Sequence, residues 1–583
     1  MSEKQINSLS QNGPPKIVLP DPSLPDPKLA DPKLADPALA HPALSHSSLP
    51  DPSLQNVTPP LPVIRTPYSG QAGTNGVHAA PWSQTKKFGF RLLFVFMLAM
   101  CIPFSASWYK NVFTLNWLRP HYRDIYDIAR FQPDFQQFFG DLNFAHPGFL
   151  ADYTDWFIAL LIGIAGASIW TILDRKSKSY HLLYYWIRVV VRYRAGIGII
   201  GFGFTKLFPT QMPYPSLGLL NSNFGDFTAQ KIYWLSVGIV PWYQVFAGVV
   251  EVTAGTLLFF RKTTTFGAIL LAGALGDITF VNYAYDGGVH VYAFYFVFLA
   301  LILLAEDLPK LYQLIILEKY TVPLHIYPDF NEPFFKYLRI GLKTLTFVIF
   351  FIILTYTEVI NFKYDPYKQP STAGIKKLRG NYLVSEFKLN GRKIPYNPLD
   401  TVRWQEATFE NWTTLTFKVN HPVVIDPSNG GGSPMRDIQR TFEITGVAGG
   451  ERAFHYLADT LDKVLYLQDK NIAASRSGRR LRQAGLRKPR QTDNWISKAA
   501  LAHIGEEKTF IDRHAWSARR DREFAAPLYG PERNRMVLKY ATTDGSHVIL
   551  SGINEHKDSI YVVLDRYDKH YILSKSNLSG GTY

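Results

Sequence analysis

The chain has 583 residues, a formal net charge of +15 and an aromatic content of 15%, so it is long enough for several domains. Its single cysteine, Cys101, excludes an internal disulfide, a CxxC redox pair and a cysteine-based metal site. The positive charge would suit nucleic acid or anionic lipid. Because much of it lies beside apolar runs, we interpret it as membrane-flanking charge and expect no nucleic-acid partner.

Residues 1–85 form a low-complexity tail. From Asp21 a five-residue unit repeats as DPSLP, DPKLA, DPKLA, DPALA, HPALS, HSSLP and DPSLQ. Proline in most units disfavours regular helix and strand, and one leucine per unit cannot build a core. We therefore predict a disordered, proline-stiffened tail that acts as a spacer or, alternatively, as a docking motif.

Residues 86–360 are predicted to form a transmembrane helical domain. A membrane helix needs about 20 predominantly apolar residues. Seven runs meet this requirement: 88–108, 154–173, 183–207, 235–260, 264–283, 289–305 and 336–360. Cys101 lies in the first run, and we interpret it as a membrane-helix cysteine rather than a lipidated one.

The lysine and arginine residues between these runs predict the orientation. They cluster before the first span, after the second, between the fourth and fifth, and after the sixth. All four clusters fall on one side if the N-terminus is cytoplasmic. The pattern predicts a multi-pass protein of the inner (plasma) membrane with its C-terminus outside.

Residues 361–583 are predicted to form an extracytoplasmic, β-rich domain. Asn390-Gly391 is typical of a hairpin turn. Further strands are expected at 414–420, 440–447, 463–469, 536–553 and 559–575. The fold class is therefore an α-helical membrane bundle followed by an antiparallel β barrel or sandwich, lipocalin-like at best. A basic insert at about 475–536 is interpreted as solvated or, alternatively, as a binding segment for anionic lipid or nucleic acid, of which the outer location disfavours nucleic acid.

Glu251 is a candidate catalytic residue because an intramembrane carboxylate is costly. The residues Gln244, Gly248, Glu251 and Gly255 share one helix face, which should point into the bundle. Asp277, on the next span, is a second candidate. The two carboxylates could share a proton, coordinate a cation, or pair with a cationic side chain of the third span. The last of these would be a structural role.

Lys206 is the third candidate catalytic residue. It ends the third span, where its side chain could snorkel to the interface or, with Gln211, form the mouth of a site. Gln211, Gln244 and Asn282 are candidate cofactor contacts, and no metal ligands are expected. Gly273 and Gly276, beside Asp277, would permit close helix approach.

Two stretches carry a family resemblance. "RYRAGIGIIGFGFTKLFP" and "GVVEVTAGTLLFFRKTTTFGAILLAG" share the pattern of a span ending in G-x-x-K, then E-x-x-x-G-x-x-L, a basic turn and a Gly/Ala-rich span. They resemble the DoxX-like family of small membrane proteins over residues 183–305. The resemblance implies a four-helix core associated in some members with quinone-linked oxidation, and it extends to Lys206 and Glu251.

These observations lead to two function hypotheses. The first is a DoxX-like membrane protein that acts as a quinone-linked redox component, with an outer β domain that binds a ligand or partner. The second is a non-enzymatic transporter or assembly factor that uses the buried carboxylates for ion or proton coupling. In both cases the expected partners are the lipid bilayer and a membrane redox or assembly protein.

Overall fold

The computed structural model describes residues 81–139, 152–321, 328, 330, 332–471, 495–526, 533–573, 575–581 and 583. Residues 72–583 form one compact unit. The repeats of the predicted tail and residues 475–490 of the predicted basic insert lie outside the described residues.

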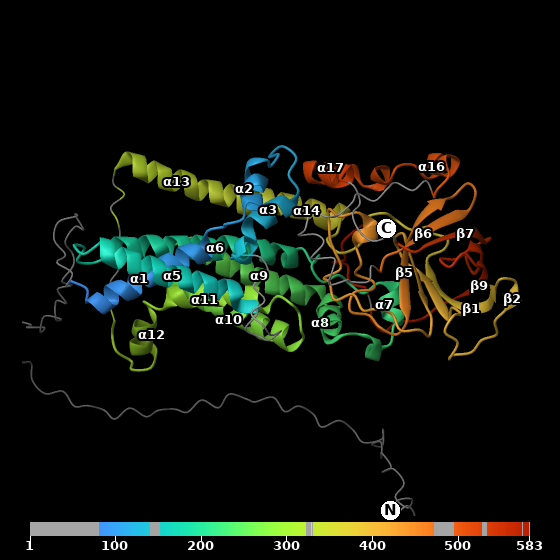
Figure 1. Ribbon diagram of the computed structural model, residues 1–583, viewed down its shortest axis with the longest axis horizontal. Coiled ribbons are helices and arrows are strands. Elements are labelled where there is room, and N and C mark those ends of the chain that lie inside the picture. Colours follow the sequence, from blue (N-terminus) through green and yellow to red (C-terminus); the bar gives the residue numbers. More distant parts are fainter. Residues whose placement is uncertain are drawn as a thin grey trace, which may run out of the picture. The chain divides into compact units, whose positions relative to one another are not determined.

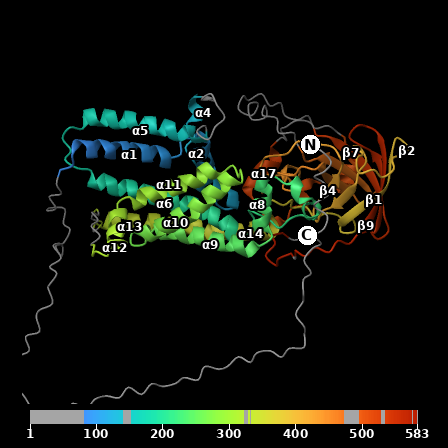
Figure 2. The same ribbon diagram turned by 90° about the horizontal axis from the view of Figure 1, so that it is seen from below.

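The first half of the described chain is helical, and helices occupy all seven predicted positions (Figure 1). In both views α6, α9, α10 and α11 run side by side (Figure 2). The helices are α1 (Gln84–Cys101), α2 (Ala106–Phe113), α3 (Tyr122–Ala129), α4 (Gln136–Phe139), α5 (Thr154–Leu173), α6 (His181–Leu207), α7 (Leu217–Asn221), α8 (Ala229–Gly238), α9 (Pro241–Leu258), α10 (Thr264–Ala284), α11 (His290–Leu304), α12 (Leu308–Ile315), α13 (Pro333–Phe347) and α14 (Leu354–Tyr364). A π-helical stretch, η4 (Val348–Ile353), joins α13 to α14.

Two of the predicted spans are broken. The run 88–108 becomes α1 and α2, bent by 57°, and Pro103 lies at the break. The run 235–260 becomes α8 and α9, bent by 92°, with Pro241 as the first residue of α9. Proline has no N–H to donate to the preceding turn, so a new helix starts there more easily than the old one continues.

Three described helices are long and apolar enough to cross a membrane: α5, α10 and the continuous Pro333–Tyr364 segment. The number rises to six if each bent pair counts as one span. Several apolar helices therefore fit a membrane protein, whereas the seven-span arrangement stays a prediction.

The C-terminal part is a closed antiparallel barrel of eight strands, which confirms the barrel prediction. Pairing of β1 with β9 closes the ring, and β2 pairs with β1 alone. The strands are β1 (Gly380–Leu389), β2 (Arg392–Lys393), β3 (Glu406–Phe409), β4 (Thr414–Lys418), β5 (Glu451–Asp459), β6 (Val464–Asp469), β7 (Arg535–Ala541), β8 (His547–Ile553) and β9 (Ser559–Tyr567). The short helical elements around them are η5 (Asp437–Gln439), α16 (Lys498–Ile504), η6 (Glu507–Phe510), η7 (Arg513–Ala515) and α17 (Ala518–Ala525).

The predicted hairpin is present, because Asn390 and Gly391 connect β1 to β2 with φ values of 51° and 77°. The strand predicted at 440–447 is wrong: this segment is a series of turns. Its charged side chains, Arg440 and Glu443, are fully buried in ion pairs with other elements. These pairs hold the segment in place without a strand ladder. The sequence reading also missed β3 and β5.

Candidate functional site

Helices α6 and α9 pack closely through glycines. A Cβ atom at Gly248 would lie 2.4 Å from the backbone N of Leu207 and 2.7 Å from the carbonyl O of Gly203. Two turns further along, a Cβ atom at Gly255 would lie 2.9 Å from the carbonyl O of Gly196. Only glycine allows backbones to approach this closely. The predicted shared face of α9 is therefore the face that contacts α6.

This close approach brings Lys206 of α6 against Glu251 of α9. The Lys206 Nζ donates to both carboxylate oxygens, at 2.7 and 2.9 Å. Glu251 is 1% exposed and Lys206 is 7% exposed. The lysine therefore points into the helical part instead of snorkelling outward. Of the alternatives, the structure shows the ion pair with a cationic side chain of the predicted third span.

The ion pair lines a cavity of about 70 Å³ among α6, α8, α9, α10 and α11. The cavity has room for roughly five waters at about 10–15 Å³ each. Four of the six sequence-predicted site residues meet there: Lys206, Gln211, Glu251 and Asn282. Most of the remaining wall is apolar or aromatic, from Phe202, Tyr233, Trp234, Tyr292 and Phe296.

The polar residues at the edge of the cavity have defined partners. Gln244 is fully buried; its Oε1 accepts from the backbone N of Met212 at 3.0 Å, and its Nε2 donates to the Met212 carbonyl at 3.1 Å. It therefore holds the chain segment that follows α6 rather than lining the cavity. Asn282 donates to the Ile278 carbonyl at 2.7 Å, and its Oδ1 lies against Gly287, where a Cβ atom would be 2.2 Å away.

Asp277 does not join this group. It is exposed, whereas Leu275, Ile278 and Asn282 of the same helix line the cavity. Within the described residues, nothing lies within 4 Å of a Cβ built at Gly273 or at Gly276. The expected close helix approach at these glycines is therefore wrong for the described part of the chain.

Sequence reasoning missed a second buried carboxylate, Glu358 of α14. It is fully buried, and its nearest described polar contact is the amide of Asn361, which donates to Oε2 at 3.4 Å. Its other oxygen has no hydrogen-bond partner among the described residues. The signal was present, since Glu358 lies in the predicted apolar run 336–360 and the rule that singled out Glu251 applies equally to it.

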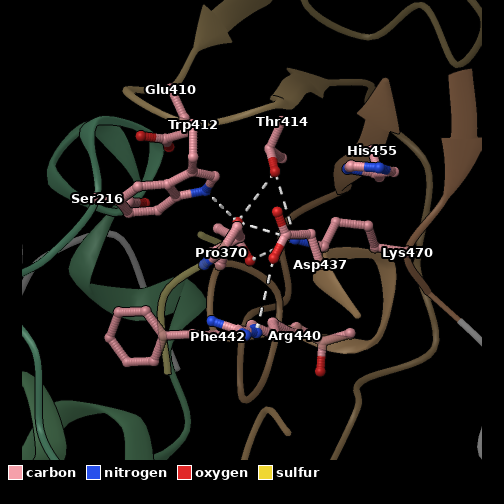
Figure 3. A network of polar contacts seen from close by, with 12 residues as sticks. Ser216, Pro370, Glu410, Trp412, Thr414, Asp437, Arg440, Phe442, His455 and Lys470 are labelled. Atoms are coloured by element: carbon pink, nitrogen blue, oxygen red, sulfur yellow. Dashed lines mark hydrogen bonds and ion pairs between the residues drawn. The ribbon is translucent and has the colours of Figure 1, made fainter. Parts of the chain in front are cut away.

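A network of buried charges joins the base of the barrel to neighbouring loops (Figure 3). Lys470 donates to both oxygens of Glu443, at 3.0 and 3.2 Å, and Thr414 donates to Oε1 at 3.1 Å. Trp412 donates to the same oxygen. Arg440 pairs at 2.8 Å with Asp365, which precedes the barrel. Each of these charges has a partner, as buried ions require.

The barrel also binds the segment that follows Lys206. The Glu410 carboxylate accepts from the backbone N atoms of Leu217 and Gly218, at 2.9 and 2.8 Å, and so caps the N-terminus of α7. Burial raises the pKa of Glu410 to about 7; the hydrogen bond from Gly218 opposes this shift, and the neighbouring Glu443 carboxylate adds to it. Glu451 accepts from Ser222 at the other end of α7. The barrel is thus in direct contact with the chain leading from the ion pair.

Among the described residues, one group of side chains has the spacing of a metal site: Asp459, Asp462 and His503. Asp459 already accepts from the backbone N of Leu461 at 3.1 Å and of Asp462 at 3.0 Å. It also contacts His503 Nδ1 at 2.9 Å. A hydrogen-bonded turn accounts for these contacts.

Comparison with protein-family models, curated proteins and solved structures finds no match. The resemblance to the DoxX-like family therefore stays a hypothesis that rests on the quoted stretches.

Proposed function

We propose that this protein is a DoxX-like, quinone-linked component of the inner membrane, and that a quinone headgroup binds in the cavity beside Lys206 and Glu251. The observation that carries the proposal is the position of a buried ion pair on the wall of an aromatic-lined cavity. A quinone has a flat ring, which suits aromatic walls, and carbonyl oxygens, which need hydrogen-bond donors.

Lys206 is the donor that such a ligand would use. A lysine ammonium carries three N–H donors, and the two contacts to Glu251 leave one for a ligand carbonyl. Glu251 balances the charge, so the site can take a neutral ligand without leaving a buried cation uncompensated.

The proposed placement follows the charge pattern: seven spans, a cytoplasmic tail and the barrel outside the membrane. The barrel would then act as the outer binding domain, for a ligand or for a membrane redox or assembly partner. Its contact with α7 supports a link between the two parts, because Glu410 binds the helix that begins eleven residues after the ion-paired lysine.

A binding measurement on the full chain in lipid nanodiscs tests the proposal. A short-chain ubiquinone should quench tryptophan fluorescence in a saturable manner, and Trp234→Phe should remove much of the signal because Trp234 lines the cavity. The double variant Lys206→Met/Glu251→Gln should lose binding. Asp277→Asn, an exposed carboxylate change on a neighbouring helix, should retain it. Equal affinity in the double variant would overturn the proposal.

A transporter or assembly factor that couples to protons is the second candidate, and Glu358 favours it. A fully buried carboxylate with an unpartnered oxygen is a proton-binding group without a described counter-ion. Proton flux into vesicles that is lost in Glu358→Gln, without any quinone-dependent electron transfer, would favour this function. Electron transfer to quinone that is sensitive to Glu251→Gln would favour the first.

A further inference from the structure

One end of the barrel contains a cavity of about 550 Å³. Small-molecule sites usually measure roughly 300–1,000 Å³. The cavity lies where β4 and β6 end and where β5, β7 and β9 begin. An eight-stranded barrel is just wide enough for side chains to fill its interior or for one small ligand to enter. We call this cavity the barrel mouth.

The floor of the barrel mouth is apolar and aromatic. Trp404 and Phe417 stack with their ring centres 3.8 Å apart, and Phe387, Met536 and Ile560 complete this surface. All five side chains are buried in the barrel core. Such a surface binds a hydrocarbon or a ring through exclusion of water.

The charged groups above this floor have an excess of negative charge. Arg452 donates to Asp469 at 2.7 Å and to Glu555 at 2.7 Å. Arg452, Asp469 and Glu555 together carry a net charge of −1; His421 and His556 also line the cavity, and His556 Nε2 lies 3.5 Å from Glu555 Oε1. The Arg452 guanidinium already donates hydrogen bonds to both carboxylates, so it is not available to bind an anionic ligand.

The barrel mouth also contains a hydrogen-bond acceptor that has no donor in the described part of the chain, the side-chain oxygen of Asn471. Asn471 donates through Nδ2 to the Val424 carbonyl at 3.1 Å, which leaves Oδ1 facing away from that bond. This oxygen is buried and has no hydrogen-bond partner among the described residues. A buried acceptor without a donor is costly, and a ligand N–H group would satisfy it.

The rim extends the apolar surface outward. Val402 and Val424 both line the cavity and are 49% and 63% exposed. They continue the apolar surface of the floor to the entrance of the cavity. The barrel mouth therefore combines an apolar surface, a net negative charge and a hydrogen-bond acceptor, Asn471 Oδ1, that has no donor in the part of the chain that the structure describes.

We propose that the barrel mouth binds an amphipathic amine, which places its apolar body on the Trp404–Phe417 floor and its protonated amino group among Asp469, Glu555 and Asn471. This inference is independent of quinone binding in the helical part, since the two cavities share no residue.

Calorimetric titration of the full chain in nanodiscs, with empty nanodiscs subtracted, tests the proposal. Phenylbutylamine, phenylbutanol and phenylpentanoate share one apolar body, a phenyl ring with four methylenes, and differ only in the head group. The amine should bind best and the carboxylate worst. Glu555→Gln removes one negative charge and should weaken amine binding about tenfold, the lower end for a charge-assisted hydrogen bond. Asp469→Asn/Glu555→Gln frees Arg452 and should reverse the order in favour of the carboxylate.

Two further variants keep the test decisive if buried substitutions disturb folding. Val424→Trp changes an exposed rim residue, so the barrel should fold while the entrance is obstructed; amine binding should fall. Asp565→Asn removes a carboxylate that contacts His547 outside the barrel mouth and should leave binding unchanged. Equal binding of amine and carboxylate by the parent protein would overturn the inference, as would undiminished amine binding by a folded Val424→Trp.

Discussion

At the scale of single residues, the buried ion pair of Lys206 with Glu251 should contribute measurably to stability. Glu251→Gln and Lys206→Met each leave one buried charge without its partner, which typically costs roughly 3–5 kcal/mol of stability. The double variant removes both charges and should lose less than either single variant. Melting temperatures of the detergent-solubilised proteins measure the difference.

Asp277→Asn is the control for this comparison, because that carboxylate is exposed and should change the melting temperature little. If the losses of the two single variants simply add in the double variant, the two side chains do not interact, and the ion pair has no energetic weight. If Lys206→Met leaves the melting temperature unchanged, the same conclusion follows, because that is the result expected of a lysine whose side chain snorkels to the interface.

Glu410 should make stability depend on pH. Its pKa of about 7 lies above the unperturbed 4.5, so the folded state holds the proton more tightly than the unfolded state does. This contribution to folding is complete below about pH 4.5 and is lost as the pH rises through about 7. Glu410→Gln should therefore reduce the fall in melting temperature between about pH 5 and about pH 8. Asp462→Asn, at an exposed turn, should leave the profile unchanged; identical profiles for Glu410→Gln and the parent would refute the assignment.

At the scale of elements, the contact between α6 and α9 decides where the ion pair can form. A methyl group at Gly248 would meet backbone atoms of Leu207 and Gly203, which cannot rotate away. Gly248→Ala should push the helices apart and cost about 1–3 kcal/mol through overpacking. Gly273→Ala is a matched control on α10, since nothing in the described chain lies within 4 Å of its Cβ. Thermal melting of both variants checks the prediction. An unchanged melting temperature for Gly248→Ala would mean that the two helices do not touch at this position.

At the scale of the whole molecule, the predicted orientation can be tested by labelling. With Cys101 replaced, single cysteines in the N-terminal tail and at Ser576 should react differently with an impermeant thiol reagent on intact cells. The tail should be protected and Ser576 labelled, because seven spans place the two ends on opposite sides. Equal labelling would contradict an odd number of spans.

The barrel depends on residues before it in the chain. Arg440 and Arg520 are both fully buried and both pair with Asp365. A fragment of residues 372–583 lacks this carboxylate, so Arg520 loses its described ion-pair partner and Arg440 keeps only Asp437, at 3.7 Å, whereas residues 365–583 retain both Asp365 pairs. The longer fragment should therefore melt at a higher temperature and more cooperatively by circular dichroism. If the two fragments melt alike, the Asp365 pairs contribute nothing to the stability of the barrel.

The sequence by itself determined the elements that depend on local chemistry. Apolar runs of sufficient length predicted the helices, and the Asn390-Gly391 turn predicted a hairpin, because periodicity and backbone preference act between near neighbours. The sequence also identified four residues that meet in one cavity: Lys206, Gln211, Glu251 and Asn282. Only the tertiary structure decided which charges pair. Lys206 and Glu251 are brought together by glycines on two helices, while Asp277 lies two residues from Leu275 and so points roughly 200° away from it around α10. The strand expected at 440–447 was lost for the same reason: its charges have partners far away in the chain, which no local pattern contains.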